Sequence, residues 1–167
     1  NSQGHCALNP VSFEEKKYEI KEAAVKKKIA VIGGGIGGME VARLCSMMGH
    51  TVDLYEKTDQ LGGVFIAAAA PDFKEKDKEL IEWYKTQIKK LPITLHMNTE
   101  ITSLSEIQAD EIVVATGAAP RKLPVPGFEK GIEAIDYLLG KKEVGTKVAV
   151  IGGGLTGCEI AYDLAKK

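Results

Sequence analysis

The sequence predicts an α/β fold with a doubly wound parallel sheet. Three observations support this fold class. A β-branched run at residues 28–32 precedes a glycine-rich turn and an apolar helical pattern, and a second strand-like run at residues 51–55 follows that helix. The same order of strand, glycine turn and helix returns near residue 150. Strands that alternate with helices in this way are typical of βαβ units, whose strands run parallel.

The individual elements follow from periodicity and from Gly and Pro positions. We expect strands over residues 28–33, 51–55, 93–97, 111–115 and 147–151. We expect helices over residues 36–48, 73–90, 131–139 and from about residue 155 to residue 167. Gly49 and Pro92 are expected to stop the first two helices. The run at 111–115 is mostly apolar, so it is expected to be buried on both faces.

The first glycine turn has the spacing G-x-G-x-x-G between a strand and a helix. In this setting Gly33 makes the tight turn, Gly35 lets a pyrophosphate approach the backbone, and Gly38 lets the helix pack against its strand. The unbonded N–H groups at the helix N-terminus favour an anion. The turn therefore predicts a Rossmann-like dinucleotide site that also includes Ile36 and Gly37. The alternative is a glycine turn without a ligand.

A second copy of this turn lies near the end of the chain. Its glycines are Gly152, Gly154 and Gly157, and residues 149–154 repeat residues 30–35 letter for letter. Two such turns in the same strand–helix setting are a stronger signal than one. The second unit shows one strand and one helix, so we interpret it as the truncated start of a second nucleotide-binding unit.

An acidic residue ends the second expected strand. Glu56, followed by Lys57, lies about 20 residues after the glycine turn, the spacing at which an acid accepts the ribose hydroxyls of a bound adenosine. The alternative is a solvated glutamate at a strand end. The fourth strand ends in Thr116 and Gly117, at the sheet edge where doubly wound folds bind ligands.

Composition excludes several other functions. A net charge of −1 gives no reason to expect nucleic acid or an anionic membrane as a partner. No apolar stretch reaches the length of a membrane span, and no signal peptide is visible, so the cytoplasm is expected. Three cysteines do not form a disulfide framework. The three histidines are scattered, which leaves no catalytic candidate in this chain.

The order of these motifs resembles the flavoproteins with two dinucleotide-binding domains. These carry G-x-G-x-x-G for FAD, an acid, L-G-G, A-T-G, and a second G-x-G-x-x-G for a nicotinamide cofactor. The corresponding residues here are 33–38, Glu56, 61–63, 115–117 and 152–157. The resemblance implies further cofactor-binding residues at Gly62, Gly63, Val64, Ala115, Thr116 and Gly117. Val64 stands where relatives have Gln, which puts one polar flavin contact in doubt.

The N-terminus resembles a narrower group. Cys6 begins a C-x-x-N-P run like the one that precedes the flavin domain in the NADH:flavin oxidoreductase family, which includes dienoyl-CoA reductase and trimethylamine dehydrogenase. The resemblance implies that electrons run from NAD(P)H to FAD, then to an iron–sulfur cluster and FMN. Cys6 would be a cluster ligand only in an intact parent protein, because one thiol cannot hold a cluster. Neither the cluster nor FMN is expected in this chain.

The expected organisation has three parts. Residues 1–27 are a lead-in from a missing iron–sulfur and barrel region, residues 28–127 bind FAD or ADP, and residues 128–167 are a linker and the beginning of the NAD(P)H-binding unit. The chain is thus expected to be a piece of a longer flavoprotein and inactive alone. Non-catalytic ADP binding and an empty site remain the alternatives. The C-terminal segment is expected to dock onto the sheet, or onto a second copy as a homo-oligomer, with Leu155, Ile160 and Leu164 among its buried residues.

Overall fold

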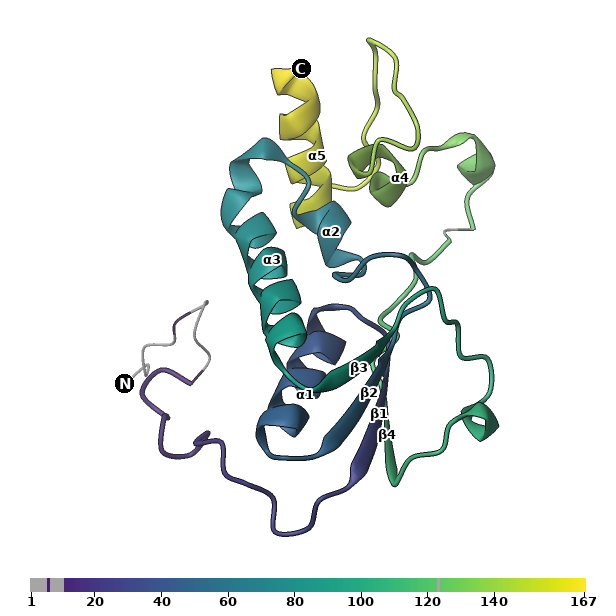
Figure 1. The fold of residues 1–167 in the computed structure, drawn as a ribbon. Coiled ribbons are helices and arrows are strands. Elements are labelled where there is room, and N and C mark those ends of the chain that lie inside the picture. Colours follow the sequence, from purple (N-terminus) through teal and green to yellow (C-terminus); the bar gives the residue numbers. More distant parts are fainter. Residues whose placement is uncertain (1–5, 7–10, 123) are drawn as a thin grey trace.

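A four-stranded parallel sheet forms the centre of the fold (Figure 1). The computed structural model describes residues 6, 11–122 and 124–167. The strand order is β3-β2-β1-β4, which places the first strand of the chain in the interior. The strands are β1 (Lys28–Ile32), β2 (Thr51–Tyr55), β3 (Ile93–His96) and β4 (Glu111–Val114). The sheet confirms the predicted Rossmann-like α/β class.

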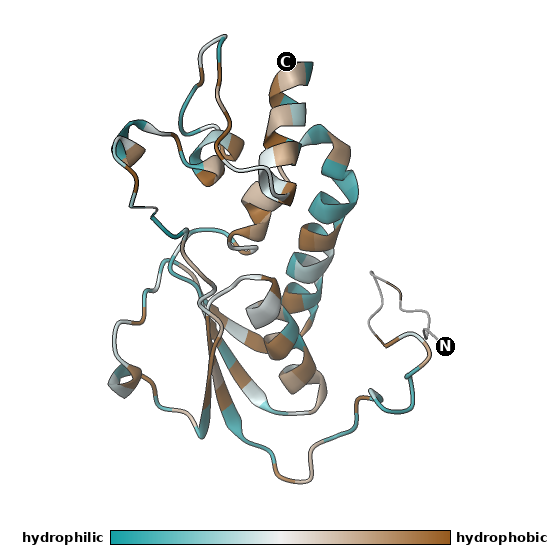
Figure 2. Cartoon of the chain, turned by 180° about the vertical axis from the view of Figure 1, so that it is seen from behind, coloured by the Kyte–Doolittle hydropathy of each residue, from teal (hydrophilic) through white to brown (hydrophobic). Residues whose placement is uncertain are grey.

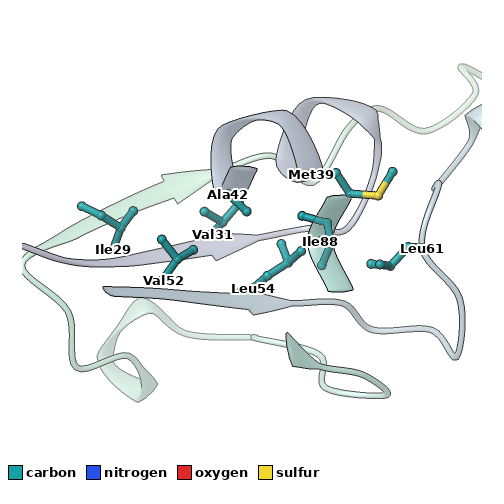
Figure 3. Packing of buried hydrophobic residues seen from close by; sticks show 8 residues of the cluster. All are labelled: Ile29, Val31, Met39, Ala42, Val52, Leu54, Leu61 and Ile88. Carbon is teal, nitrogen blue, oxygen red and sulfur yellow. The ribbon is translucent and has the colours of Figure 1, made fainter. Parts of the chain in front are cut away.

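Two helices cover one face of the sheet. Helix α1 (Ile36–Met47) contacts β1 and β2, and helix α3 (Glu75–Lys90) packs on α1. Figure 3 shows the core between them, which consists of Ile29, Val31, Met39, Ala42, Val52, Leu54, Leu61 and Ile88. Alternate strand residues supply one layer of this core, and helix residues one turn apart supply the other. This packing fixes where β1 ends and α1 begins.

Helix α3 begins later than its sequence pattern indicates. Residues Asp72–Lys74 form a 3₁₀ turn, η1, directly before it, and a short helix α2 (Phe65–Ala68) occupies part of the stretch expected to be a loop. The buried apolar residues of α3 are Ile81 and Ile88, whereas Leu80 is half-buried. Figure 2 shows hydrophobic and hydrophilic residues interspersed along α3, as in a helix that has one apolar and one polar face.

The prediction that the strand over residues 111–115 is buried on both faces is wrong. Strand β4 pairs with β1 alone and forms one edge of the sheet. Val114 keeps 61% of its surface exposed. Strand order, which depends on long-range pairing, decides this exposure. An apolar run alone does not distinguish an edge strand from an interior one.

The strand expected over residues 147–151 is also absent, and this part of the chain makes no ladder with β1–β4. Ile151 is 89% exposed and Leu155, expected in a core, is 78% exposed; Ile160 and Leu164, the other expected core residues, are half-buried. A β-branched run forms a strand only where a partner strand accepts its backbone hydrogen bonds, and the described part of the chain offers none here.

The C-terminal helix packs beside the sheet domain without joining the sheet, which corrects the predicted docking onto it. Helix α5 (Leu155–Lys166) touches α4 (Ala134–Leu138), where the Tyr137 hydroxyl donates to Asp163 at 2.6 Å. It also contacts η1, where Lys74 pairs with Glu159 at 2.7 Å. Two further 3₁₀ turns lie in the connecting segments, η2 (Leu104–Glu106) and η3 (Phe128–Lys130). Exchange with a second copy stays a prediction.

None of the helices in the described residues is both long enough and apolar enough to cross a membrane.

Candidate dinucleotide-binding site

The glycine turn at residues 33–38 connects β1 to α1 at the carboxyl edge of the sheet (Figure 1). Gly33 has φ +108°, a conformation that residues with a side chain rarely adopt. A Cβ there would overlap the backbone carbonyl of Ala115, at the end of β4. The Gly33 N–H donates to the Tyr55 carbonyl at 2.8 Å, which ties the turn to the end of β2.

Gly35 and Gly38 have the two environments that the fingerprint predicts. A Cβ on Gly38 would overlap the Gly33 carbonyl oxygen, so glycine permits close helix–strand packing there. A Cβ on Gly35 would meet nothing within 4 Å, so this backbone faces open space. The first turn of α1 itself carries no acidic residue, so no side chain of the helix competes there with a bound anion. This arrangement fits a phosphate group at Gly35.

Glu56 lies beside the glycine turn with only 6% of its surface exposed. Its Oε2 accepts the Gly34 N–H at 2.7 Å. Its Oε1 accepts both the N–H and the hydroxyl of Thr58 at 2.8 Å. Glu56 is therefore not a solvated strand-end residue. The sequence predicted the acid, and it missed Thr58, whose signal is a hydroxyl residue two positions after that acid.

The L-G-G segment lies against the same turn. The Gly62 N–H donates to the Gly34 carbonyl at 2.9 Å, and Gly62 forms a parallel bridge with Gly35. A Cβ on Gly63 would stand 3.1 Å from the Gly35 Cα, so a side chain would crowd the turn. Leu61 packs beneath Gly34, and Val64 is 58% exposed. The predicted residues 33–38, 56 and 62–63 are thus brought together.

The A-T-G segment completes one side of the site. Ala115 continues β4 and donates its N–H to the Ile32 carbonyl at 2.8 Å, next to Gly33. Thr116 and Gly117 follow it and are exposed at the sheet edge. Lys57 is exposed next to Glu56 and supplies positive charge near this edge. Residues that follow β2 and β4 therefore present backbone groups and a lysine at the same carboxyl edge of the sheet as Gly35.

A polar cluster that the sequence did not predict supports the ends of β2 and β3. His96 Nε2 lies 2.9 Å from Asp53 Oδ1, and the His96 ring stacks on Tyr55 at 4.4 Å. Burial and the nearby Asp53 carboxylate raise the pKa of Tyr55. These contacts agree with the structural role expected for His96. They hold β3 against β2, where Glu56 begins its turn.

The second fingerprint has the backbone geometry of the first but not its surroundings. Gly152 has φ +112°, Gly154 caps α5, and a Cβ on Gly157 would overlap the Gly152 carbonyl oxygen. A Cβ on Gly152 or on Gly153 would meet nothing within 4 Å. Whether these glycines contact a nicotinamide cofactor stays a prediction, as do the contacts of the first turn.

An apolar groove of about 380 Å³ lies elsewhere, between α2, α3 and α4. Its lining includes Ile66, Ile81 and Leu138, and the glycine turn does not contribute to it. The turn at Gly35 is therefore an exposed turn at the carboxyl edge of the sheet, and it lies outside this groove.

The expected cluster ligand Cys6 is exposed. Among residues 6, 11–122 and 124–167, no group of three His, Cys, Asp or Glu side chains is placed to hold a metal ion. The C-x-x-N-P run otherwise lies outside the described residues. Its role as part of a cluster site stays a prediction about a larger protein.

Comparison with known proteins identifies the class. The chain belongs to the pyridine nucleotide-disulphide oxidoreductase family, whose model matches residues 8–106 and 102–167. It is similar to cinnamate reductase of Clostridium sporogenes, with 43% identity over 164 residues, covering 97% of this chain and 25% of that protein. It is similar to NADH oxidase of Thermoanaerobacter brockii, with 37% identity over 176 residues, covering 100% of this chain and 27% of that protein.

A solved structure agrees with these relatives. The complex of 2-naphthoyl-CoA reductase with 2-naphthoyl-CoA matches with a TM-score of 0.89 and 37% identity, over 97% of this chain and 26% of that one. The chain thus spans about a quarter of the length of the relatives it matches. The expected family and its oxidoreductase class are confirmed. The chain is a pyridine nucleotide-disulphide oxidoreductase domain like those of flavoprotein reductases.

Proposed function

We propose that this chain binds the ADP half of FAD in an NAD(P)H-dependent flavin oxidoreductase. The observation that carries the proposal is the open backbone at Gly35, flanked by the N-terminus of α1 and by the buried carboxylate of Glu56. The α1 N-terminus and Gly35 would hold the pyrophosphate, and Glu56 would accept a ribose hydroxyl. When bound, FAD supplies the hydride and electron chemistry.

The wider role extends the proposal to a parent protein. There the chain passes electrons from NAD(P)H through FAD toward an iron–sulfur cluster and FMN, with Cys6 among the cluster ligands and Gly152, Gly154 and Gly157 facing NAD(P)H. The similarity to reductases and to an NADH oxidase supports this route. We also propose a cytoplasmic location, and we expect this chain alone to be inactive.

ADP as a structural ligand is the second candidate. One observation favours it: the residues proposed for the phosphate and the ribose lie together, whereas Val64, at the position of a polar flavin contact, is apolar and 58% exposed. Under this candidate the chain binds an adenylate tightly and has no preference for the flavin half.

Calorimetric titration of the purified chain with FAD and with ADP separates the candidates. FAD binding, together with release on denaturation of a compound that has the absorbance spectrum of a flavin, supports the oxidoreductase role. Equal or tighter ADP binding with no bound flavin supports the structural role. If neither nucleotide binds, the proposed function is wrong.

A further inference from the structure

Thr58 holds one oxygen of the Glu56 carboxylate with two donors. Its backbone N–H and its hydroxyl both lie 2.8 Å from Glu56 Oε1. The other oxygen, Oε2, accepts the Gly34 N–H at 2.7 Å. Each carboxylate oxygen has about two acceptor positions. Oε1 is therefore saturated, and Oε2 keeps one acceptor position beside the glycine turn.

The Thr58 hydroxyl has a choice of acceptor. It lies 2.8 Å from Glu56 Oε1 and 3.0 Å from the Gln60 carbonyl, and it has a single proton to donate. A hydrogen bond to a charged carboxylate is shorter and stronger than one to a neutral carbonyl. The hydroxyl therefore donates to Glu56, and the carboxylate cannot rotate away from Gly34 without losing this bond.

The backbone that carries Thr58 is fixed from the neighbouring strand. The Asn98 N–H donates to the Thr58 carbonyl at 2.9 Å, and the Thr99 N–H donates to the Glu56 carbonyl at 2.9 Å. Both donors follow the end of β3 directly. The Thr58 side chain itself is exposed, so its substitution opens no cavity in the core. The backbone of residues 56–58 is thus held in place by hydrogen bonds, and the Thr58 hydroxyl can be removed without disturbing the core.

We infer that Thr58 is a positioning residue that makes this site distinguish between the 2′ and the 3′ hydroxyl of the adenosine ribose. By occupying Oε1 it presents Oε2 alone to the nucleotide, so a single ribose hydroxyl of the adenosine is bonded, and the two hydroxyls are not equivalent. This inference rests on the proposed function, because it requires that an adenine nucleotide binds beside Gly35.

Calorimetry with ADP, 2′-deoxy-ADP and 3′-deoxy-ADP tests the inference on the full chain. The unmodified protein should lose about three- to tenfold in affinity for one of the two deoxy nucleotides and little for the other, the cost of one hydrogen bond. In Thr58→Val, which keeps the shape but removes the hydroxyl, this preference should fall below about twofold. Thr58→Ser, which keeps the hydroxyl, should retain it.

The outcomes of these titrations and one further measurement exclude a merely structural effect. If Thr58→Val weakens ADP and both deoxy nucleotides by the same factor, or changes nothing, the inference is overturned. Glu56→Ala and the double variant Glu56→Ala/Thr58→Val should show the same ratio of affinities for the two deoxy nucleotides, because the carboxylate that Thr58 orients is absent from both. If the unmodified chain binds ADP without any preference, Thr58 has no such role. If it binds no adenine nucleotide, the proposed function fails and takes this inference with it.

Discussion

The two glycine turns of this chain share a local shape and differ in everything around it. Gly33 and Gly152 have φ +108° and +112°, and Gly35 and Gly154 both cap a helix with extended backbone. The first helical hydrogen bonds also match, at 2.9 Å from Met39 to Gly35 and 3.0 Å from Cys158 to Gly154. Six residues with this glycine spacing, three before the helix and three in its first turn, therefore suffice to shape the turn.

What surrounds the turns is different. A Cβ on Gly33 would overlap Ala115, and one on Gly34 would crowd Leu61 and Glu56, whereas Gly152 and Gly153 face nothing within 4 Å. Strand β1 pairs with two strands, and residues 147–151 pair with none in the described part of the chain. The comparison shows that the local shape of a glycine turn is not enough for a binding site. Neighbouring strands must also bring an acidic residue and further segments, here residues 61–63 and 115–117, beside the turn.

The largest expected effect compares Gly38→Ala with Gly157→Ala. Both new methyl groups would overlap a carbonyl oxygen of their own turn. The first turn is fixed by two neighbouring strands and cannot relax, so Gly38→Ala should cost about 3 kcal/mol of unfolding free energy. Gly157→Ala should cost less than about 1 kcal/mol, because residues 147–151, which precede its turn, pair with no strand in the described part of the chain and leave the turn free to shift. Urea denaturation measures both, and equal losses would show that the surroundings do not matter.

The next effect concerns binding. Gly35→Val would fill the open space where the pyrophosphate is expected, so ADP affinity should fall by at least about 100-fold, or about 2.7 kcal/mol. Gly154→Val, the matched change in the second turn, should leave ADP affinity unaltered. Circular dichroism should show both variants folded. Retained binding in Gly35→Val would place the phosphate elsewhere.

Glu56 belongs to the first turn only and sharpens the comparison further. Glu56→Ala should weaken ADP or FAD binding by about 1–3 kcal/mol, the range for losing a charged hydrogen bond. It should also destabilise the fold, because the Gly34 N–H loses its acceptor. Calorimetry and urea denaturation separate the two losses. If the affinity for ADP and FAD does not change, the role of Glu56 is structural and the residue does not bind the ribose.

Deletion of residues 145–167 tests how much the second unit contributes. The deletion removes the Lys74–Glu159 pair and the edge-to-face contact of Phe73 with Tyr162. We expect a loss of about 1 kcal/mol in stability, because a few contacts at the margin of the core are lost. Thermal melts and light scattering measure stability and oligomeric state. If neither changes, α5 contributes nothing to the sheet domain.

The smallest effect is a pH dependence of the contact between α5 and α4, where Asp163 accepts hydrogen bonds from Tyr137 and Lys167. Hydrogen bonds from Lys167 and Tyr137 lower the pKa of Asp163. A depressed carboxyl pKa stabilises the folded state above the unfolded value of about 3.9 and loses this contribution as pH falls through the folded value. Asp163→Asn should therefore lower the melting temperature at pH 7. The difference should shrink below about pH 4, and a constant difference would argue against the ionised pair.

The sequence allowed most of the first unit to be predicted. The glycine spacing, the acid at Glu56 and the L-G-G and A-T-G segments all lie together in the structure, because each is encoded within a few residues of a strand end. Predictions about exposure were weaker. Val114 and Leu155 were expected in the interior and are exposed, because burial depends on partners far away in the chain.

Local sequence alone fixes the two glycine turns and the starts of α1 and α5, since the backbone conformation at Gly33 and Gly152 and helix capping at Gly35 and Gly154 are local properties. Only the tertiary structure decided that β4 is an edge strand, that residues 147–151 make no strand, and that Thr58 holds Glu56 against Gly34. The physical reason is that backbone ladders and buried hydrogen bonds need two partners, and the identity of the second partner is set by folding and not by neighbouring residues.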